Sequence, residues 1–211
     1  MAYDPLRGVV VLFGGWRSVV DNGSDETWEY DGVDWRQVVV ATSPPGRLQT
    51  AMTYDAAGQR MILLSGTRNG PGEIQDSWAY DGLTWTELTG SQPPAQSRYT
   101  LAYDAHRQRA IALATDGTWE LDGDGWRRLT PILSPAHRYG GTTAYDGRRR
   151  AIVVFGGSDP VLGPVADTWT FRFANGADAP EACLVEAADD DGDGLAGCAD
   201  PDCWARCAPM C

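Results

Sequence analysis

The chain has 211 residues, a length that supports one medium-sized domain with a hydrophobic core and a shorter appended segment. Hydrophobic residues make up 43% of the sequence and aromatic residues 10%, which argues against a disordered chain. The formal net charge of −12 argues against nucleic acid and anionic membrane as partners, and no apolar stretch is long enough to span a bilayer.

A Tyr-Asp pair recurs four times, and each copy opens one repeat of the sequence. The pairs are Tyr3-Asp4, Tyr54-Asp55, Tyr103-Asp104 and Tyr145-Asp146. After a tight turn, each pair is followed by a short apolar run bounded by turn residues, which predicts a buried strand. The runs are Val9–Phe13, Met61–Leu64, Ala110–Leu113 and Ala151–Phe155. We expect the Asp of each pair to accept hydrogen bonds from backbone N–H groups of the turn.

The next predicted strand of each repeat carries a tryptophan and, two residues later, a second large side chain on the same face. These strands contain Trp28-Glu29-Tyr30, Trp78-Ala79-Tyr80, Trp119-Glu120-Leu121 and Trp169-Thr170-Phe171. In the first three repeats an Asp-Gly hairpin signal follows, and then a further tryptophan: Trp35, Trp85 and Trp126. Each of the first three repeats therefore predicts four short antiparallel strands, and the last repeat predicts the same strands without the fourth.

Together with Gly14-Gly15 and Gly156-Gly157 after the second strand, these features resemble kelch repeats, as in kelch propellers and the central domain of galactose oxidase. The resemblance implies an all-β fold in which residues 1–173 form four kelch-type four-stranded antiparallel blades of a partial β-propeller, at about 1–42, 43–91, 92–133 and 134–173. It is weaker in the third repeat, where Ala114-Thr115 replaces the double glycine. An arginine stands seven residues before the tyrosine as Arg47 and Arg138, whereas Arg98 stands only five before it.

Four blades are fewer than kelch propellers usually have. The resemblance therefore implies missing N-terminal blades in a longer protein, and the alternative is an open four-blade arc with exposed edges.

In a four-stranded blade, the connections between strands two and three and between successive blades lie on one face. These connections are long in repeats one, two and four, and loops on a rigid scaffold often carry function. The contact candidates on this face are Trp16, Arg17, Arg68, Asn69 and Asp159. In the third repeat Thr115–Thr118 predicts a tight hairpin, where we expect no room for a contact.

Enzyme chemistry finds little support in the sequence, and we expect no catalytic residues and no enzyme. Copper chemistry of the galactose oxidase kind needs several histidines and a tyrosine near a cysteine, but the chain has only His106 and His137, predicted on opposite faces. Fragments such as Ser24–Trp28 faintly echo the Asp-box of sialidases without its full spacing. The alternative is a remnant or fragment of a propeller-type glycan-acting enzyme, sialidase-like or galactose oxidase-like.

Residues 183–211, after a linker at 174–182, form an acidic tail that contains every cysteine of the chain. Crowded cysteines in a short segment predict disulfide bonds in an oxidising compartment, and the odd number leaves one thiol to pair elsewhere or stay free. The disulfide candidates are Cys183, Cys198, Cys203, Cys207 and Cys211. A Zn²⁺ site formed by the last four cysteines is an alternative, although no two of them have the usual C-x-x-C spacing.

The same tail has the alternating carboxylates of a calcium-binding loop, with ligands predicted from Asp189, Asp191, Asp193, the Leu195 carbonyl and Asp200. It resembles the Ca²⁺ repeats of thrombospondin type 3 and dockerins, and the Cys-rich tails of myxobacterial surface proteins. A solvated acidic tail is the alternative. These features predict a secreted or cell-surface bacterial protein that binds a protein or glycan partner through its propeller loops and Ca²⁺ through a small irregular, disulfide-rich tail.

Overall fold

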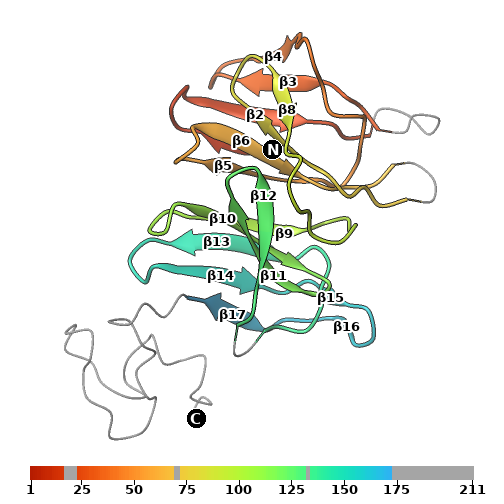
Figure 1. Ribbon diagram of the computed structural model, residues 1–211, viewed down its shortest axis with the longest axis vertical. Coiled ribbons are helices and arrows are strands. Elements are labelled where there is room, and N and C mark those ends of the chain that lie inside the picture. Colours follow the sequence, from red (N-terminus) through yellow and green to blue (C-terminus); the bar gives the residue numbers. More distant parts are fainter. Residues whose placement is uncertain (17–22, 69–71, 132–133, 173–211) are drawn as a thin grey trace, which may run out of the picture.

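A computed structural model describes residues 1–16, 23–68, 72–131 and 134–172. All the regular structure in these residues is β, and the blades follow one another in chain order along the long axis of the molecule (Figure 1). None of the described residues forms a helix that is long and apolar enough to cross a membrane. The prediction of an all-β partial propeller with four blades is therefore confirmed.

The first three blades are four-stranded antiparallel sheets whose strands lie in sequence order. Blade 1 contains β1 (Ala2–Asp4), β2 (Val9–Phe13), β3 (Thr27–Tyr30) and β4 (Trp35–Val38). Blade 2 contains β5 (Ala51–Asp55), β6 (Arg60–Leu64), β7 (Ser77–Tyr80) and β8 (Trp85–Glu87). Blade 3 contains β9 (Thr100–Asp104), β10 (Arg109–Ala114), β11 (Gly117–Asp122) and β12 (Gly125–Leu129).

Blade 4 is a sheet of three strands, β13 (Thr142–Asp146), β14 (Ala151–Phe155) and β17 (Thr168–Phe171). The connection between β14 and β17 contains a small hairpin of β15 (Ser158–Asp159) and β16 (Gly163–Pro164), which the sequence patterns did not predict. Within the described residues the blade ends at β17, and the segment to which the predicted lack of a fourth strand refers lies outside the described residues.

The hydrophobic core lies between the blades, because each sheet packs a face against the next sheet. Alternating side chains of β2, such as Val11 and Phe13, meet Met61, Leu63 and Trp85 of blade 2. Two further clusters repeat this arrangement, between blades 2 and 3 and between blades 3 and 4. The first strands β1, β5, β9 and β13 lie next to one another, so they form the inner edge of the stack.

The Tyr-Asp pairs combine a local turn with a contact between blades. Asp104 Oδ1 accepts hydrogen bonds from the backbone N–H groups of His106 and Arg107, and Asp4 and Asp146 do the same in their own turns. This confirms the predicted role of the aspartates. Two of the tyrosine hydroxyls reach the preceding blade, where Tyr103 Oη accepts from the Ala57 N–H at 3.0 Å and Tyr145 Oη from the His106 N–H at 3.1 Å.

Candidate functional site

The long loops of the molecule lie at one end of the blades, on the right-hand side of Figure 1. They connect β2 to β3, β6 to β7 and β14 to β17, and they are accompanied by the segments that lead from one blade to the next. We call this side the loop face. Blade 3 is different, because only Thr115 and Asp116 separate β10 from β11.

Buried arginines hold the loop face together in blades 2 and 4. The Arg47 side chain is completely buried, and both of its terminal nitrogens bind the Asp76 carboxylate, with Nη2 at 2.8 Å from Oδ2. Its guanidinium also donates to the carbonyl groups of Ser65 and Pro45. These four bonds occupy the side chain, so Arg47 is a structural residue.

Arg138 repeats this arrangement in blade 4. Its terminal nitrogens bind the Asp167 carboxylate at 2.6 and 3.0 Å, and the guanidinium donates to the carbonyls of Gly156 and Ala136. Hydrogen bonds from Arg138 and from the Trp169 indole N–H favour the ionised carboxylate and lower the pKa of Asp167 to about 2. The ion pair with Arg138 therefore favours the anionic form of the Asp167 carboxylate.

Blade 3 has a glutamine where blades 2 and 4 have this arginine. Gln96 stands seven residues before Tyr103 and is completely buried, and its Oε1 accepts from the Thr115 N–H at 2.7 Å. Its Nε2 has no hydrogen-bond partner. Arg98, the arginine that the sequence offered for this role, is exposed on the surface. The shorter glutamine leaves blade 3 without the ion pair that fills the corresponding space in its neighbours.

A cavity of about 240 Å³ lies between blades 3 and 4 on the loop face. Its walls come from the β10–β11 hairpin, Leu113–Thr118, and from the segment Ser134–Arg138 that leads into β13. Two buried polar atoms on these walls, Thr118 Oγ1 and His137 Nε2, have no hydrogen-bond partner. We expected no room for a contact at this tight hairpin, and that expectation is wrong because the hairpin and the segment that leads into β13 enclose this cavity.

A second cavity, of about 230 Å³, lies at the opposite ends of blades 2 and 3, and Arg60 is one of the residues that line it. Its guanidinium bonds to Asp55 at 3.2 Å, Asp124 at 3.3 Å and the Gly123 carbonyl at 2.9 Å. This charged side chain links the turns of two blades, which is a structural use.

The predicted contact residues have different surroundings. Trp16 is 64% exposed at the start of the β2–β3 connection, and Arg68 is exposed in the β6–β7 connection. Asp159 is buried, and its Oδ1 accepts from the Val161 and Leu162 N–H groups at 2.7 and 2.8 Å, so its carboxylate closes the β15–β16 turn. Arg17 and Asn69 lie outside the described residues.

Two exposed apolar side chains were missed by the sequence reasoning. Val161 and Leu162, at the tip of the β15–β16 hairpin, are 89% and 76% exposed. The sequence did contain a signal for this exposed surface, because two apolar residues stand side by side in a segment that was predicted to be a loop.

The predicted metal ligands Asp189, Asp191, Asp193, Leu195 and Asp200 lie outside the described residues, and so do all five cysteines. Within residues 1–172, leaving aside the gaps stated above, no group of three His, Cys, Asp or Glu side chains could hold a metal ion.

Comparison with known proteins identifies the fold and no further relationship. No family model and no curated protein matches the chain. Among solved structures, the one described as "Structure of YjhT" superposes with a TM-score of 0.55 at 14% sequence identity. The match covers 72% of this chain and 51% of that one, so the chain spans about half the length of this structural neighbour. At this identity the likeness supports the fold alone.

Proposed function

We propose that this chain is a secreted or cell-surface bacterial protein that binds a protein or a glycan through its loop face, and that it acts as a binding or scaffolding module. The observation that carries the proposal is the exposed apolar surface on the loops, at Trp16, Val161 and Leu162. Apolar side chains presented by loops on a rigid scaffold are typical of contact surfaces. Tryptophan is also enriched among the residues that dominate binding energy.

The charged groups of the loop face support the same interpretation. A glycan-acting enzyme needs carboxylates or arginines that can reach the substrate. Here the buried side chains of Arg47 and Arg138 are ion-paired with Asp76 and Asp167. Asp116, beside the cavity, accepts the Trp119 indole N–H at 2.8 Å. These groups already have structural partners, which favours a binding module over the alternative of a glycan-acting enzyme.

Leu162→Ser and Leu83→Ser form a matched pair of variants that tests the loop face. Both leucines are highly exposed, at 76% and 79%, but Leu83 lies in the β7–β8 turn at the opposite ends of the blades. The labelled full chain is applied to arrays of defined oligosaccharides and of purified bacterial surface proteins, and the strongest ligand is then titrated.

We expect Leu162→Ser and Trp16→Ala each to weaken binding at least about tenfold, which corresponds to about 1.4 kcal/mol. Leu83→Ser is expected to retain the affinity of the parent chain. Equal affinity in all variants, or release of sugar from an array glycan, would contradict the proposal.

The proposed Ca²⁺ site concerns the acidic tail, and its support is the spacing of Asp189, Asp191 and Asp193. Ca²⁺ would neutralise carboxylates that otherwise repel one another, while disulfides would limit the unfolded conformations of the segment. Calorimetric titration of the oxidised full chain with Ca²⁺ is expected to give a saturable heat that Asp191→Ala and Asp193→Ala remove. Identical heats for parent and variants at millimolar Ca²⁺ would leave only a solvated tail.

A further inference from the structure

The ends of the blades opposite the loop face carry the turns between first and second strands, on the left-hand side of Figure 1. We call this side the turn face. In blade 1, Arg7 of this turn binds both Asp4 and the buried Glu29 of β3. Blade 3 repeats the second contact, because Arg107 binds the buried Glu120 of β11 at 2.8 Å. In both blades a carboxylate of the third strand balances the arginine of the turn.

Blade 4 has no such carboxylate in its third strand. Thr170 of β17 stands at the position that the two glutamates occupy in their own sheets. The turn itself, residues 146–150, contains three arginines and one aspartate. The other carboxylates in the described part of blade 4, those of Asp159 and Asp167, lie at the loop face. The turn therefore carries an excess of positive charge that the described part of its own blade does not balance.

Arg148 and Arg150 present this charge to the solvent. Both are exposed, and neither side chain forms an ion pair or a hydrogen bond with any residue that the structure describes. The exposed aspartates in the neighbouring turns of blade 3 do not neutralise them, because those aspartates already pair with Arg60 and Arg109. The turn of blade 4 is thus a candidate site for carboxylates.

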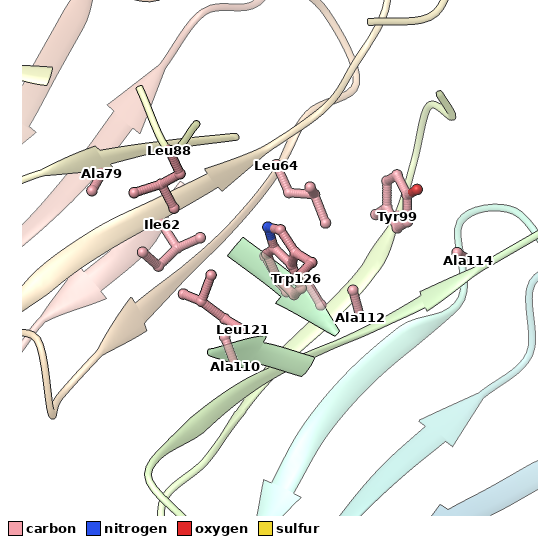
Figure 2. Packing of buried hydrophobic residues seen from close by; sticks show 11 residues of the cluster. Ile62, Leu64, Ala79, Leu88, Tyr99, Ala110, Ala112, Ala114, Leu121 and Trp126 are labelled. Carbon is pink, nitrogen blue, oxygen red and sulfur yellow. The ribbon is translucent and has the colours of Figure 1, made fainter. Parts of the chain in front are cut away.

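The turns stand on a fixed surface, because neighbouring blades share a packed core. Figure 2 shows Trp126 of blade 3 beside Leu64 of blade 2, in the cluster that joins these two blades. Ile111 and Ile152 belong to the cluster that joins blades 3 and 4. The arginine turn of blade 4 is therefore held in place relative to the rest of the turn face.

The chain leaves blade 4 at the same end. The last residue of β17, Phe171, lies opposite Ile152, the second residue of β14, which directly follows the arginine turn. Residues 174–211 contain nine aspartates and glutamates and one arginine, so they carry −8 of the net charge of −12. The chain between residue 172 and Asp189 can span at most roughly 55–60 Å. The acidic cluster at residues 189–193 is therefore within reach of the turn.

We propose that the arginine turn of blade 4, residues 146–150, binds the carboxylates of residues 186–193 in the acidic tail of the same chain. Exposed ion pairs are individually weak, so a separate acidic peptide would bind this turn poorly. Connection through the same chain raises the effective concentration to on the order of millimolar, at which several weak pairs together suffice. The bound tail covers part of the turn face and leaves the loop face accessible to its partner.

The test uses the oxidised full chain with the photoreactive residue p-benzoylphenylalanine in place of Ala188, beside the acidic cluster. Illumination in EDTA is followed by chymotryptic digestion and mass spectrometry of the cross-linked peptides. We expect cross-links that are concentrated on the arginine turn, with a yield that does not change when the chain is diluted. Raising the salt from about 0.1 M to about 1 M shortens the Debye length from about 10 Å to about 3 Å and should lower this yield at least about threefold.

Two double variants form a matched pair for this measurement. Arg148→Ser with Arg150→Gly changes the turn face, and Arg68→Ser with Arg98→Gly changes the loop face. All four arginines are exposed, and both glycine substitutions fall at positive φ angles, 48° at Arg150 and 55° at Arg98, which glycine adopts without strain. We expect the first variant to lose most of the cross-links to the turn and the second to retain the yield of the parent chain. Arg148→Lys with Arg150→Lys, which keeps both charges, should retain the contact.

Three results would overturn the proposal. The yield could be unchanged in the turn-face variant, or it could fall equally in both double variants, as expected from a general effect of charge. A yield that decreases on dilution would place the tail on a second copy of the chain instead. Because the measurement contains neither Ca²⁺ nor a loop-face ligand, its failure is separate from failure of the Ca²⁺ titration or of the array experiment.

Discussion

Single buried side chains decide how the loops of each blade are held. Arg47 and Arg138 make the same set of bonds to an aspartate and two carbonyl groups in their respective blades. An ion pair with a buried arginine is costly to break from the aspartate side, because removal of the aspartate leaves the arginine charge unpaired in a low-dielectric site. The arginines were visible in the sequence by their spacing, but their partners were not, because the pairs are 29 residues apart in the chain.

The Arg138–Asp167 pair predicts a loss of stability in acid. The pKa of Asp167 is lowered to about 2, below the value of about 3.9 for an unfolded aspartate. Its stabilising contribution is complete above the unfolded value and is lost as the pH falls through about 2. Urea unfolding of Asp167→Asn should therefore show a lower free energy of unfolding than the parent at pH 7 and a smaller decrease between pH 4 and pH 2.

Asp25→Asn, at an exposed position in the loop before β3, provides the control for the loss of one negative charge. It should follow the parent chain throughout this pH range. An Asp167→Asn variant that is as stable as the parent at pH 7 would show that the ion pair contributes nothing.

At the scale of the blade, the short apolar runs and the turn residues that bound them predicted the strands closely. The apolar runs Val9–Phe13 and Ala151–Phe155 are β2 and β14. The β15–β16 hairpin was missed because Asp159 closes it through backbone contacts within a loop segment that has no strand period. The cavity beside Thr118 was missed for a different reason. Its walls come from two segments of neighbouring blades, Leu113–Thr118 and Ser134–Arg138, and the length of the local hairpin alone does not predict the space between them.

At the scale of the molecule, the two end blades each have a face that no other described blade covers. Trp35 of blade 1 is 43% exposed, although Trp85 and Trp126 at the same position are buried. Phe155 of blade 4 is 54% exposed, whereas Phe13 at the same position of blade 1 is buried. Uncovered apolar faces of this kind favour association and make the isolated stack less stable than a closed ring. The number of repeats predicted either missing blades or an open arc, and side-chain exposure identifies the residues of the uncovered faces.

Phe13→Ala and Phe155→Ala form a matched pair that measures what the covering blade contributes. The two phenylalanines occupy the same position of the second strand, and they differ in whether a neighbouring blade packs on them. Phe13→Ala leaves a cavity against Trp85 and should lower the free energy of unfolding by about 3–5 kcal/mol. Phe155→Ala removes a half-exposed ring and should cost much less, about 1 kcal/mol or below. It should also reduce self-association in sedimentation experiments, because part of the uncovered face is lost.

If both variants lost several kcal/mol at a concentration where the chain is monomeric, Phe155 would have to be covered in solution. The outer face of blade 4 would then not be open in the isolated chain.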